Sequence, residues 1–422
     1  MALPAATARA AALCRIAACA SASSAAAAAT GGRRGAEKLP FSLAERGMVV
    51  GGHRGMGMNA VGAPPGARIE AVRERENTLL SFGRAAAHAA VAFVEFDVQV
   101  TKDGCPIIFH DDFILTQETD AVYAKRVTDL LLEEFLSYGP QKNSHEVIYS
   151  FFCWLLLCQV HGYECIFEMP FCKLALMLIV QISKPLLRRT SDGRVVNWSA
   201  KDDDSLCTLQ EVFERVSPRL GFNIELKFDD DIFYERSQLD RALQAVLQVV
   251  SQYASNRPVF FSTFHPDAAR IMRELQSLYP VLFLTEGGTA QHKDSRRNSL
   301  DEAIRVCLEY ELHGLVSEVR GVLKNPSAVL RAKESNLALL TYGQLNNVWE
   351  AVYIQYLMGV NGVIVDLVEE ISNAVADFSK PVLNQSMLGS GVDLVGAKHQ
   401  AFSQQQLGFL LRLIPELIQQ PH

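Results

Sequence analysis

The chain has 422 residues, 49% of them hydrophobic, which suffices for the core of one large domain or two medium ones and excludes disorder of the whole chain. Its net charge of −7 and its lack of long basic blocks exclude nucleic acid as a partner. The nine cysteines form no CxxC pair, so reduced thiols are favoured over a disulfide framework and no zinc site is expected.

The first part of the chain has the composition of a targeting segment. Residues 1–36 are rich in alanine and serine, carry four arginines and contain no acidic residue. This composition is typical of an organelle transit peptide, whereas a secretory signal, the alternative, would have a leucine-rich apolar core. We therefore predict a disordered transit peptide over residues 1–40 that directs the protein to the chloroplast or plastid, in preference to the mitochondrion.

Beyond this segment, short apolar runs alternate with stretches of helical periodicity, such as residues 79–91 and 239–254. Strands that are apolar on both faces and alternate with helices predict a parallel sheet, and about eight such units predict an α/β fold of the TIM (β/α)8 barrel type. A doubly wound open sheet is the alternative. We place the barrel at residues 46–372 and a C-terminal helical extension at 373–422. The candidate strands are residues 48–52, 93–100, 105–110, 222–227, 259–264, 281–285, 314–318, 338–342 and 362–366.

Nine candidate strands are one too many for a barrel of eight. Only the turn-like TKDG separates residues 93–100 from residues 105–110. Parallel neighbours need a connection of about a dozen residues or more, so these two runs are predicted to form an antiparallel hairpin. The hairpin would fold His110 back towards Glu95 and Asp97, which point to the same face of their strand. Two carboxylates on one inward face repel each other unless a cation lies between them.

Polar residues also stand at the ends of the first strand and of strand 222–227. Because the carboxyl ends of barrel strands meet at one mouth, these residues are expected to join the hairpin residues. Three carboxylates are oxygen ligands suited to Mg²⁺ or Ca²⁺ and not to zinc, and two cationic side chains suit a phosphate. Two histidines supply an acid and a base for displacement at phosphorus. The three carboxylates are Glu95, Asp97 and Glu225. The two cationic side chains are Arg54 and Lys227, and the two histidines are His53 and His110.

A set of motifs in this order resembles the glycerophosphodiester phosphodiesterase family. The resemblance implies a TIM barrel that uses a divalent metal to cleave small-molecule glycerophosphodiesters, such as glycerophosphocholine or glycerophosphoethanolamine, into sn-glycerol 3-phosphate and an alcohol. It extends from about Met48 to Leu367. The motifs are GGHRG (51–55), RENT (75–78), EFDVQVTKDGCPIIFHD (95–111), NIELK (223–227), FSTFHPD (261–267) and GVNGVIVD (359–366).

The same resemblance implies roles for single residues. Two positions depart from the family pattern: Arg75 replaces a usual proline, and Asn361 replaces a common aspartate near the last strand. The first affects turn rigidity more than chemistry, and neither position is a proposed ligand. By motif, His53 and His110 match the acid/base pair, Glu95, Asp97 and Glu225 match the metal ligands, and Arg54, Glu76 and Lys227 match substrate- or phosphate-binding and metal-site support residues.

Residues 143–183 form a further departure, an apolar stretch without helix caps or strand alternation. Its two apolar runs are each shorter than the roughly 20 residues that span a bilayer, so no transmembrane segment is predicted. Without this stretch the chain would continue as a polar loop over the barrel mouth. We therefore interpret it as an insertion foreign to the fold, such as a translated intron or a splice variant.

Two other functions remain open at this point. A related lysophospholipase-D-like activity would need an apolar groove. A non-catalytic ligand-binding barrel would result if the insertion distorted the loops over the site.

Overall fold

In the computed structural model, the described part of the chain comprises residues 47–59, 73–118, 121–141, 184–190 and 192–378. The expected transit peptide, the apolar insertion at 143–183 and residues 379–422 of the expected C-terminal extension lie outside the described residues. Within the described residues, none of the helices combines the length and apolar character needed to cross a membrane.

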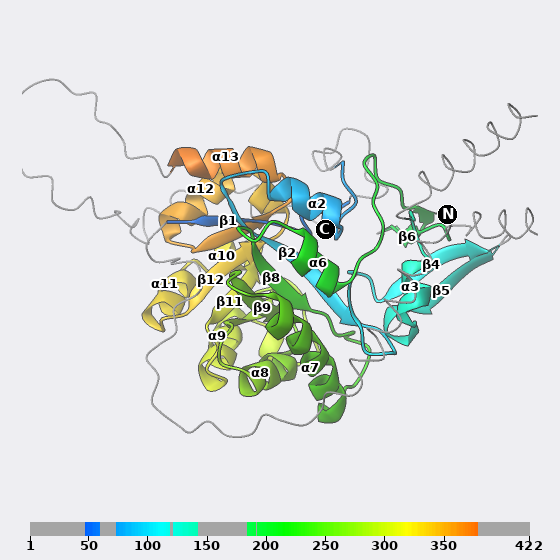
Figure 1. Cartoon of the computed structure of the whole chain (residues 1–422). Coiled ribbons are helices and arrows are strands. Elements are labelled where there is room, and N and C mark those ends of the chain that lie inside the picture. Colours follow the sequence, from blue (N-terminus) through cyan, green and yellow to red (C-terminus); the bar gives the residue numbers. More distant parts are fainter. Residues whose placement is uncertain (1–46, 60–72, 119–120, 142–183, 191, 379–422) are drawn as a thin grey trace, which may run out of the picture. The chain divides into compact units, whose positions relative to one another are not determined.

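Eight parallel strands close into a barrel (Figure 1). From β2 through β8 to β13, each barrel strand pairs with the next one along the chain, and β1 pairs with both β13 and β2. This closure confirms the predicted TIM barrel and excludes the open, doubly wound sheet. The strands are β1 (Val49–Gly52), β2 (Val91–Val100), β8 (Gly221–Leu226), β9 (Val259–Thr263), β10 (Val281–Thr285), β11 (Gly314–Glu318), β12 (Ala338–Tyr342) and β13 (Gly362–Val365).

The ninth candidate strand, β3 (Pro106–Ile108), pairs antiparallel with the end of β2. Val98 lies opposite Ile108, and Val100 lies opposite Pro106. The predicted hairpin is therefore confirmed, and it extends β2 beyond the barrel.

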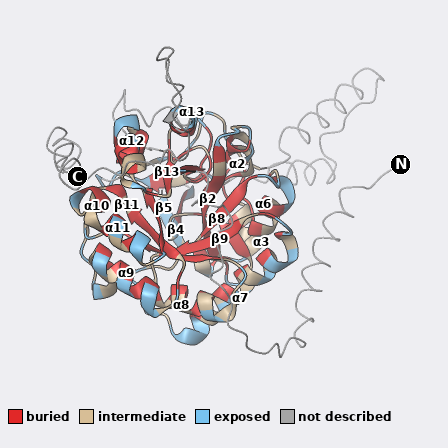
Figure 2. Ribbon diagram, turned by 90° about the vertical axis from the view of Figure 1, so that its left-hand side faces the viewer, coloured by how far each residue is buried: buried red, intermediate tan, exposed pale blue. Residues whose placement is uncertain are grey.

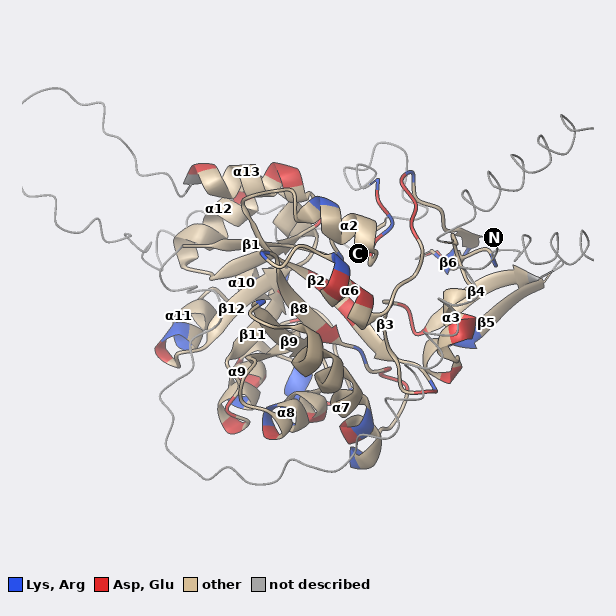
Figure 3. Ribbon diagram, in the orientation of Figure 1, with Lys and Arg blue, Asp and Glu red and all other residues tan. Residues whose placement is uncertain are grey.

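Helices surround the barrel, with their buried faces against the strands and their exposed faces outward (Figure 2). In α7, the buried residues Leu239, Leu243, Val246 and Val250 recur every three or four positions, as expected for one apolar face. Charged residues lie on the outer surfaces of helices such as α8 and α11 (Figure 3). The helices are α2 (Leu79–Ala85), α6 (Leu209–Arg215), α7 (Arg236–Tyr253), α8 (Pro266–Leu275), α9 (Leu300–Glu309), α10 (Val319–Lys324), α11 (Ser327–Glu334), α12 (Trp349–Met358) and α13 (Val368–Phe378). Helix α13 crosses the boundary that we expected between the barrel and the C-terminal extension, at residues 372 and 373.

The inside of the barrel has an apolar layer below a polar one. Phe93 of β2 belongs to the apolar cluster, and Glu95 and Asp97 follow on the same face of the strand towards its carboxyl end. A Cβ on Gly51 would lie 2.2 Å from the Phe93 ring, so β1 needs glycine at this point. The other buried residues of the inner apolar cluster are Val49, Phe260, Leu282, Leu284, Val316, Ala338, Leu340 and Ile364.

A second, small antiparallel sheet lies in the connection between β3 and β8, in the order β5-β4-β6-β7. It corrects our expectation of a polar loop, because residues 184–198 form two of its strands. A separate apolar cluster that includes Phe109, Phe135 and Trp198 packs against it. This packing makes residues 184–198 form strands although their sequence looks like a polar loop. The elements of this region are β4 (Phe113–Glu118), β5 (Ala121–Arg126), η2 (Val127–Asp129), α3 (Leu132–Leu136), β6 (Leu187–Arg189) and β7 (Val195–Asn197).

The two ends that flank the apolar insertion lie side by side. The backbone N–H of Gly139 donates to the carbonyl of Lys184 at 2.9 Å, and the N–H of Lys184 donates to the carbonyl of Ser137 at 3.3 Å. The chain therefore resumes at Lys184 beside Ser137 and Gly139, close to the point where the described residues before the insertion end.

Candidate active site

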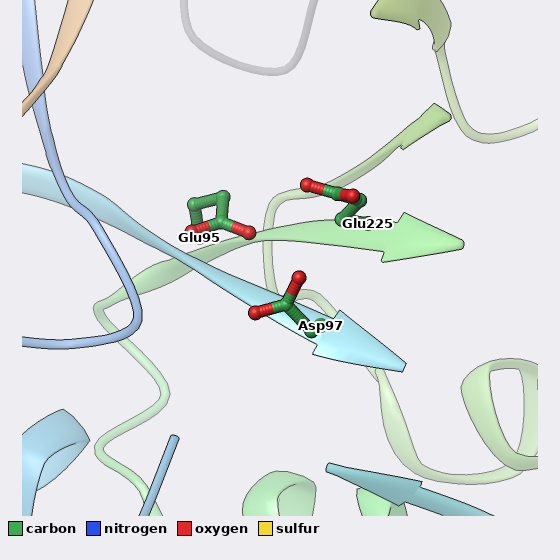
Figure 4. A group of neighbouring side chains, drawn as sticks. All are labelled: Glu95, Asp97 and Glu225. Atoms are coloured by element: carbon green, nitrogen blue, oxygen red, sulfur yellow. The ribbon is translucent and has the colours of Figure 1, made fainter. Parts of the chain in front are cut away.

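Three carboxylates meet at the carboxyl ends of two neighbouring strands (Figure 4). Glu95 and Asp97 lie on β2, Glu225 lies on β8, and one ligand atom from each lies within 4.8 Å of the others. The register places Asp97 opposite Glu225, so the alternation along both strands turns the three side chains to the same interior face. The structure thus brings together the three residues that the sequence groups as metal ligands.

The carboxylate cluster fits a divalent cation. Glu95 and Asp97 are almost fully buried, and within the described residues no hydrogen-bond donor reaches Glu95 Oε1. Burial, together with the charges of Asp97 and Glu225, raises the pKa of Glu95 to about 8. A cation among these oxygens would offset both the burial and the repulsion, and carboxylate oxygens are the ligands that Mg²⁺ and Ca²⁺ prefer.

Two basic side chains flank the cluster and line the same cavity. Arg54 Nε lies 3.3 Å from Asp97 Oδ2, and Lys227 Nζ lies 3.2 Å from Glu225 Oε1. Burial alone would raise the pKa of Asp97, but the charges of Arg54, His110 and Lys227 and a hydrogen bond from Asn77 together outweigh it and hold that pKa below its usual range. Burial would lower the pKa of Lys227, but Glu225 and Asp97 raise it overall. Both basic groups therefore remain charged and suit a phosphate.

The turn after β1 fixes Arg54. Its φ of +49° lies in the left-handed region, which is uncommon for a residue other than glycine. Its backbone N–H donates to Glu95 Oε2 at 3.1 Å, and its Nη1 donates to Glu76 Oε1 at 2.7 Å. Burial opposes ionisation of Glu76, but Arg188 and Arg54 lower its pKa to about 2. Glu76 is not among the described residues that line the cavity, so its contacts make it a support of Arg54.

His53 stands at the end of β1, beside the last strand of the barrel. Its Nδ1 lies 2.8 Å from Asp366 Oδ1, just after β13, and its Nε2 lies 3.9 Å from Glu95 Oε2. The N–H of Met58 donates to the same Asp366 oxygen at 3.0 Å, and the Asn347 side chain donates to the other at 2.8 Å. Burial lowers the pKa of His53, but Asp366 more than offsets this and the net shift is upward.

His110 reaches the cavity from the hairpin side. Its Nδ1 lies 2.7 Å from Asp111 Oδ1. Burial and the charge of Arg54 lower its pKa. In both histidines a carboxylate therefore occupies Nδ1, which leaves Nε2 as the nitrogen for proton transfer.

The cavity at the mouth has a volume of about 320 Å³. One part of its lining is polar and carries the histidines, the basic residues, Glu95 and Glu225. The rest of the wall combines polar residues such as Asn223 and Glu286 with apolar and aromatic ones, including Phe264, Leu284, Tyr342 and Ile364. This arrangement suits a small substrate with one anionic group.

The sequence matches the model of the glycerophosphoryl diester phosphodiesterase family over residues 53–370. This chain belongs to that family and is a phosphodiesterase. The chloroplastic glycerophosphodiester phosphodiesterase GDPD1 of Arabidopsis thaliana is 50% identical over 378 residues, which cover 89% of this chain and 92% of the relative. The glycerophosphocholine phosphodiesterase GDE1 of Eremothecium gossypii is 30% identical over 342 residues, which cover 75% of this chain and 25% of that protein. A crystal structure from Silicibacter pomeroyi shares the fold, with a TM-score of 0.53, 18% identity and coverage of 79% of this chain and 95% of that one.

Some residues at the site of this phosphodiesterase escaped the sequence reasoning. Asp366 directly follows the last strand, so the strand-end argument applied to His53 and Glu225 would have found it. Asn77 stands inside the RENT motif, and its side-chain amide donates to Asp97 Oδ2 at 2.9 Å. Arg188 lies outside every motif, and nothing in the sequence signals its contacts with the site.

Proposed function

We propose that this phosphodiesterase hydrolyses glycerophosphodiesters to sn-glycerol 3-phosphate and an alcohol with the help of Mg²⁺ or Ca²⁺. The observation that carries the proposal is the single cavity in which a buried carboxylate cluster, two basic side chains and two carboxylate-bound histidines converge. Water adds to phosphorus, and the bond from phosphorus to the alcohol oxygen breaks.

Each group then has a role in this reaction. Glu95, Asp97 and Glu225 would hold a divalent cation, whose positive charge would stabilise the negative charge that develops on the phosphate. Arg54 and Lys227 bind and orient phosphate oxygens. His53 and His110 transfer protons, one taking a proton from the attacking water and the other giving one to the departing alcohol.

Glycerophosphocholine and glycerophosphoethanolamine are the substrates that we propose, because both are small enough for the cavity. The name of the Eremothecium gossypii relative supports the first. Release of glycerol 3-phosphate from a panel of glycerophosphodiesters, with EDTA and add-back of each metal, tests the proposal. Lysophosphatidylcholine in the same panel tests the lysophospholipase-D-like alternative. Absence of glycerol 3-phosphate from every substrate, or full activity in EDTA, would overturn the proposal.

A chloroplast location is also proposed. It rests on the composition of residues 1–36 and on the chloroplastic name of the Arabidopsis relative. A fluorescent protein fused behind residues 1–40 should enter isolated chloroplasts, and retention outside them would contradict this location.

Deletion of residues 143–183, with Lys142 joined to Lys184, should leave the protein at least as soluble and thermally stable and equally or more active. The flanking backbone at Gly139 and Lys184 is already hydrogen-bonded, so a shorter loop closes it at a lower entropic cost. Thermal unfolding and glycerol 3-phosphate release measure the outcome.

A variant in which a Gly-Ser linker of equal length replaces the same residues is the matched control for loop length. Misfolding of the deletion variant, or loss of its activity while folded, would show that the segment belongs to the working structure. A gain of activity from an inactive parent would instead support the non-catalytic barrel as the state of the full chain.

A further inference from the structure

Arg188 connects the small sheet to the active site. It lies on β6, its side chain is only 11% exposed, and its guanidinium carbon is 4.2 Å from the centre of the Trp198 ring. Trp198 belongs to the apolar cluster below this sheet, and Arg75 also packs on its ring, at 4.8 Å. Packing therefore holds the guanidinium in place on an element outside the barrel.

The guanidinium of Arg188 binds both oxygens of Asp111. Nε donates to Oδ2 at 3.1 Å, and Nη2 donates to Oδ1 at 2.9 Å. Oδ1 is also the atom that lies 2.7 Å from His110 Nδ1. Because a planar fork bound to both carboxylate oxygens fixes the plane of the carboxylate, it also restricts the ring that the carboxylate holds.

The Asp111 carboxylate needs this restraint more than the Asp366 carboxylate, which binds the other histidine. Its side chain is 29% exposed, whereas that of Asp366, the partner of His53, is 7% exposed. Two neutral donors, the N–H of Met58 and the side chain of Asn347, fix Asp366 from inside the protein. Without Arg188, the Asp111 carboxylate could turn towards water.

Arg188 also contacts Glu76, the carboxylate that holds Arg54 at the cavity. Its Nη2 donates to Glu76 Oε1 at 2.9 Å, the same oxygen that accepts from Arg54 Nη1 at 2.7 Å. One guanidinium on the small sheet thus contacts the carboxylate behind His110 and the carboxylate behind Arg54.

The charge of Arg188 also acts on the Asp111 carboxylate itself. Burial raises the pKa of Asp111, but its contacts with His110 and Arg188 lower it well below its usual range. Asp111 binds the cationic guanidinium of Arg188, whereas within the described residues the Asp366 side chain meets only neutral donors besides His53.

We propose that Arg188 is a positioning residue of the phosphodiesterase: by holding both oxygens of Asp111, it fixes the imidazole of His110 at the cavity. The small antiparallel sheet then takes part in catalysis through this one side chain. The inference rests on the proposed function, in which His110 transfers a proton.

Arg188→Met tests the role, because methionine keeps an unbranched stem against Trp198 and removes the fork. We expect kcat for glycerophosphocholine to fall about 10- to 100-fold, as for the displacement of a catalytic group by about 1 Å, while KM stays within about threefold. Arg188→Lys keeps the charge but not the two-oxygen contact, so it should recover only a small part of the loss. Arg189→Met is the matched control, because Arg189 is the next residue on the same strand, is exposed and, in the described part of the chain, donates from its side chain only to the Gly193 carbonyl.

A double-mutant cycle with Asp111→Asn separates positioning from a general effect on structure. If Arg188 acts through Asp111, most of the loss caused by Arg188→Met should disappear in the Asp111→Asn background. Losses that multiply in the double variant, or normal kcat in folded Arg188→Met, would overturn the inference. Should Arg188→Met fail to fold in thermal unfolding measurements, Arg188→Lys in the same cycle decides, since it keeps the ion pairs. An inactive wild-type protein would instead overturn the proposed function.

Discussion

His53→Ala and His110→Ala should each lower kcat for a glycerophosphodiester by about 10²- to 10⁴-fold while leaving the fold intact. Both imidazoles line the cavity, and each has its Nδ1 beside a carboxylate, so each variant removes one proton-transfer group. Neither residue belongs to the buried apolar clusters of the barrel, so little packing is lost. Glycerol 3-phosphate release gives kcat, and thermal unfolding verifies the fold.

The control for these variants is His88→Ala. His88 lies just before β2, at the amino-terminal end of the barrel, whereas the site occupies the carboxyl-terminal end. We expect normal turnover from it. Near-normal turnover in a folded His53 or His110 variant would remove that residue from the proposed mechanism.

The barrel and the centre of its site followed from local patterns in the sequence. Apolar runs alternating with helical periodicity predict the parallel strands, and the short TKDG connection predicts the β2–β3 hairpin. The alternation of side chains along a strand then places Glu95 and Asp97 together. These inferences need only residues that are close in the sequence or a rule about strand ends.

The supporting contacts could not be predicted in the same way. Asp366 meets His53 only because the last strand pairs with the first, a contact across 313 residues. Arg188 meets Asp111 across 77 residues, from a stretch whose arginines and turn residues look like a polar loop. What makes that stretch form strands is the apolar cluster under it, which gathers residues from β3 to Leu206. Such a cluster has no periodic signal in any one segment.

Arg75 illustrates the same limit at a single position. The sequence shows only that it replaces a usual proline and so affects the rigidity of a turn. In the structure its side chain is fully buried, pairs with Asp203 and donates to the Trp198 carbonyl at 2.8 Å. It therefore ties the turn that carries Glu76 to the small sheet.

Glu95→Gln, Asp97→Asn and Glu225→Gln should each weaken the binding of Mg²⁺ or Ca²⁺ by about 10- to 100-fold or more. Changes to residues that merely support metal ligands already cost about that much, and each of these variants removes a proposed direct ligand. Activity should be lost at low cation concentration and partly return in excess. Calorimetric titration of the cation measures the affinity without depending on turnover.

Glu286→Gln is the matched control, because Glu286 lines the same cavity but contacts His292 instead of belonging to the cluster. It should bind the cation as the wild type does. Cation affinity equal to that of the wild type in all three cluster variants, or full activity in EDTA, would contradict the carboxylate site.

Stability without the cation gives an independent measure of the same cluster. In EDTA, the raised pKa of Glu95 keeps this side chain protonated in the folded protein up to a pH of about 8, whereas a free glutamate side chain has a pKa of 4.5. The folded state therefore binds more protons than the unfolded chain between these two pH values, so the stability of the protein should fall as the pH rises from one to the other.

Glu95→Gln has no such proton to lose, so its unfolding temperature should depend less on pH and exceed that of the wild type at pH 8. Adding the cation should reverse the order, because only the wild type gains a complete set of ligands. An order that stays the same with and without the cation would mean that Glu95 does not bind it.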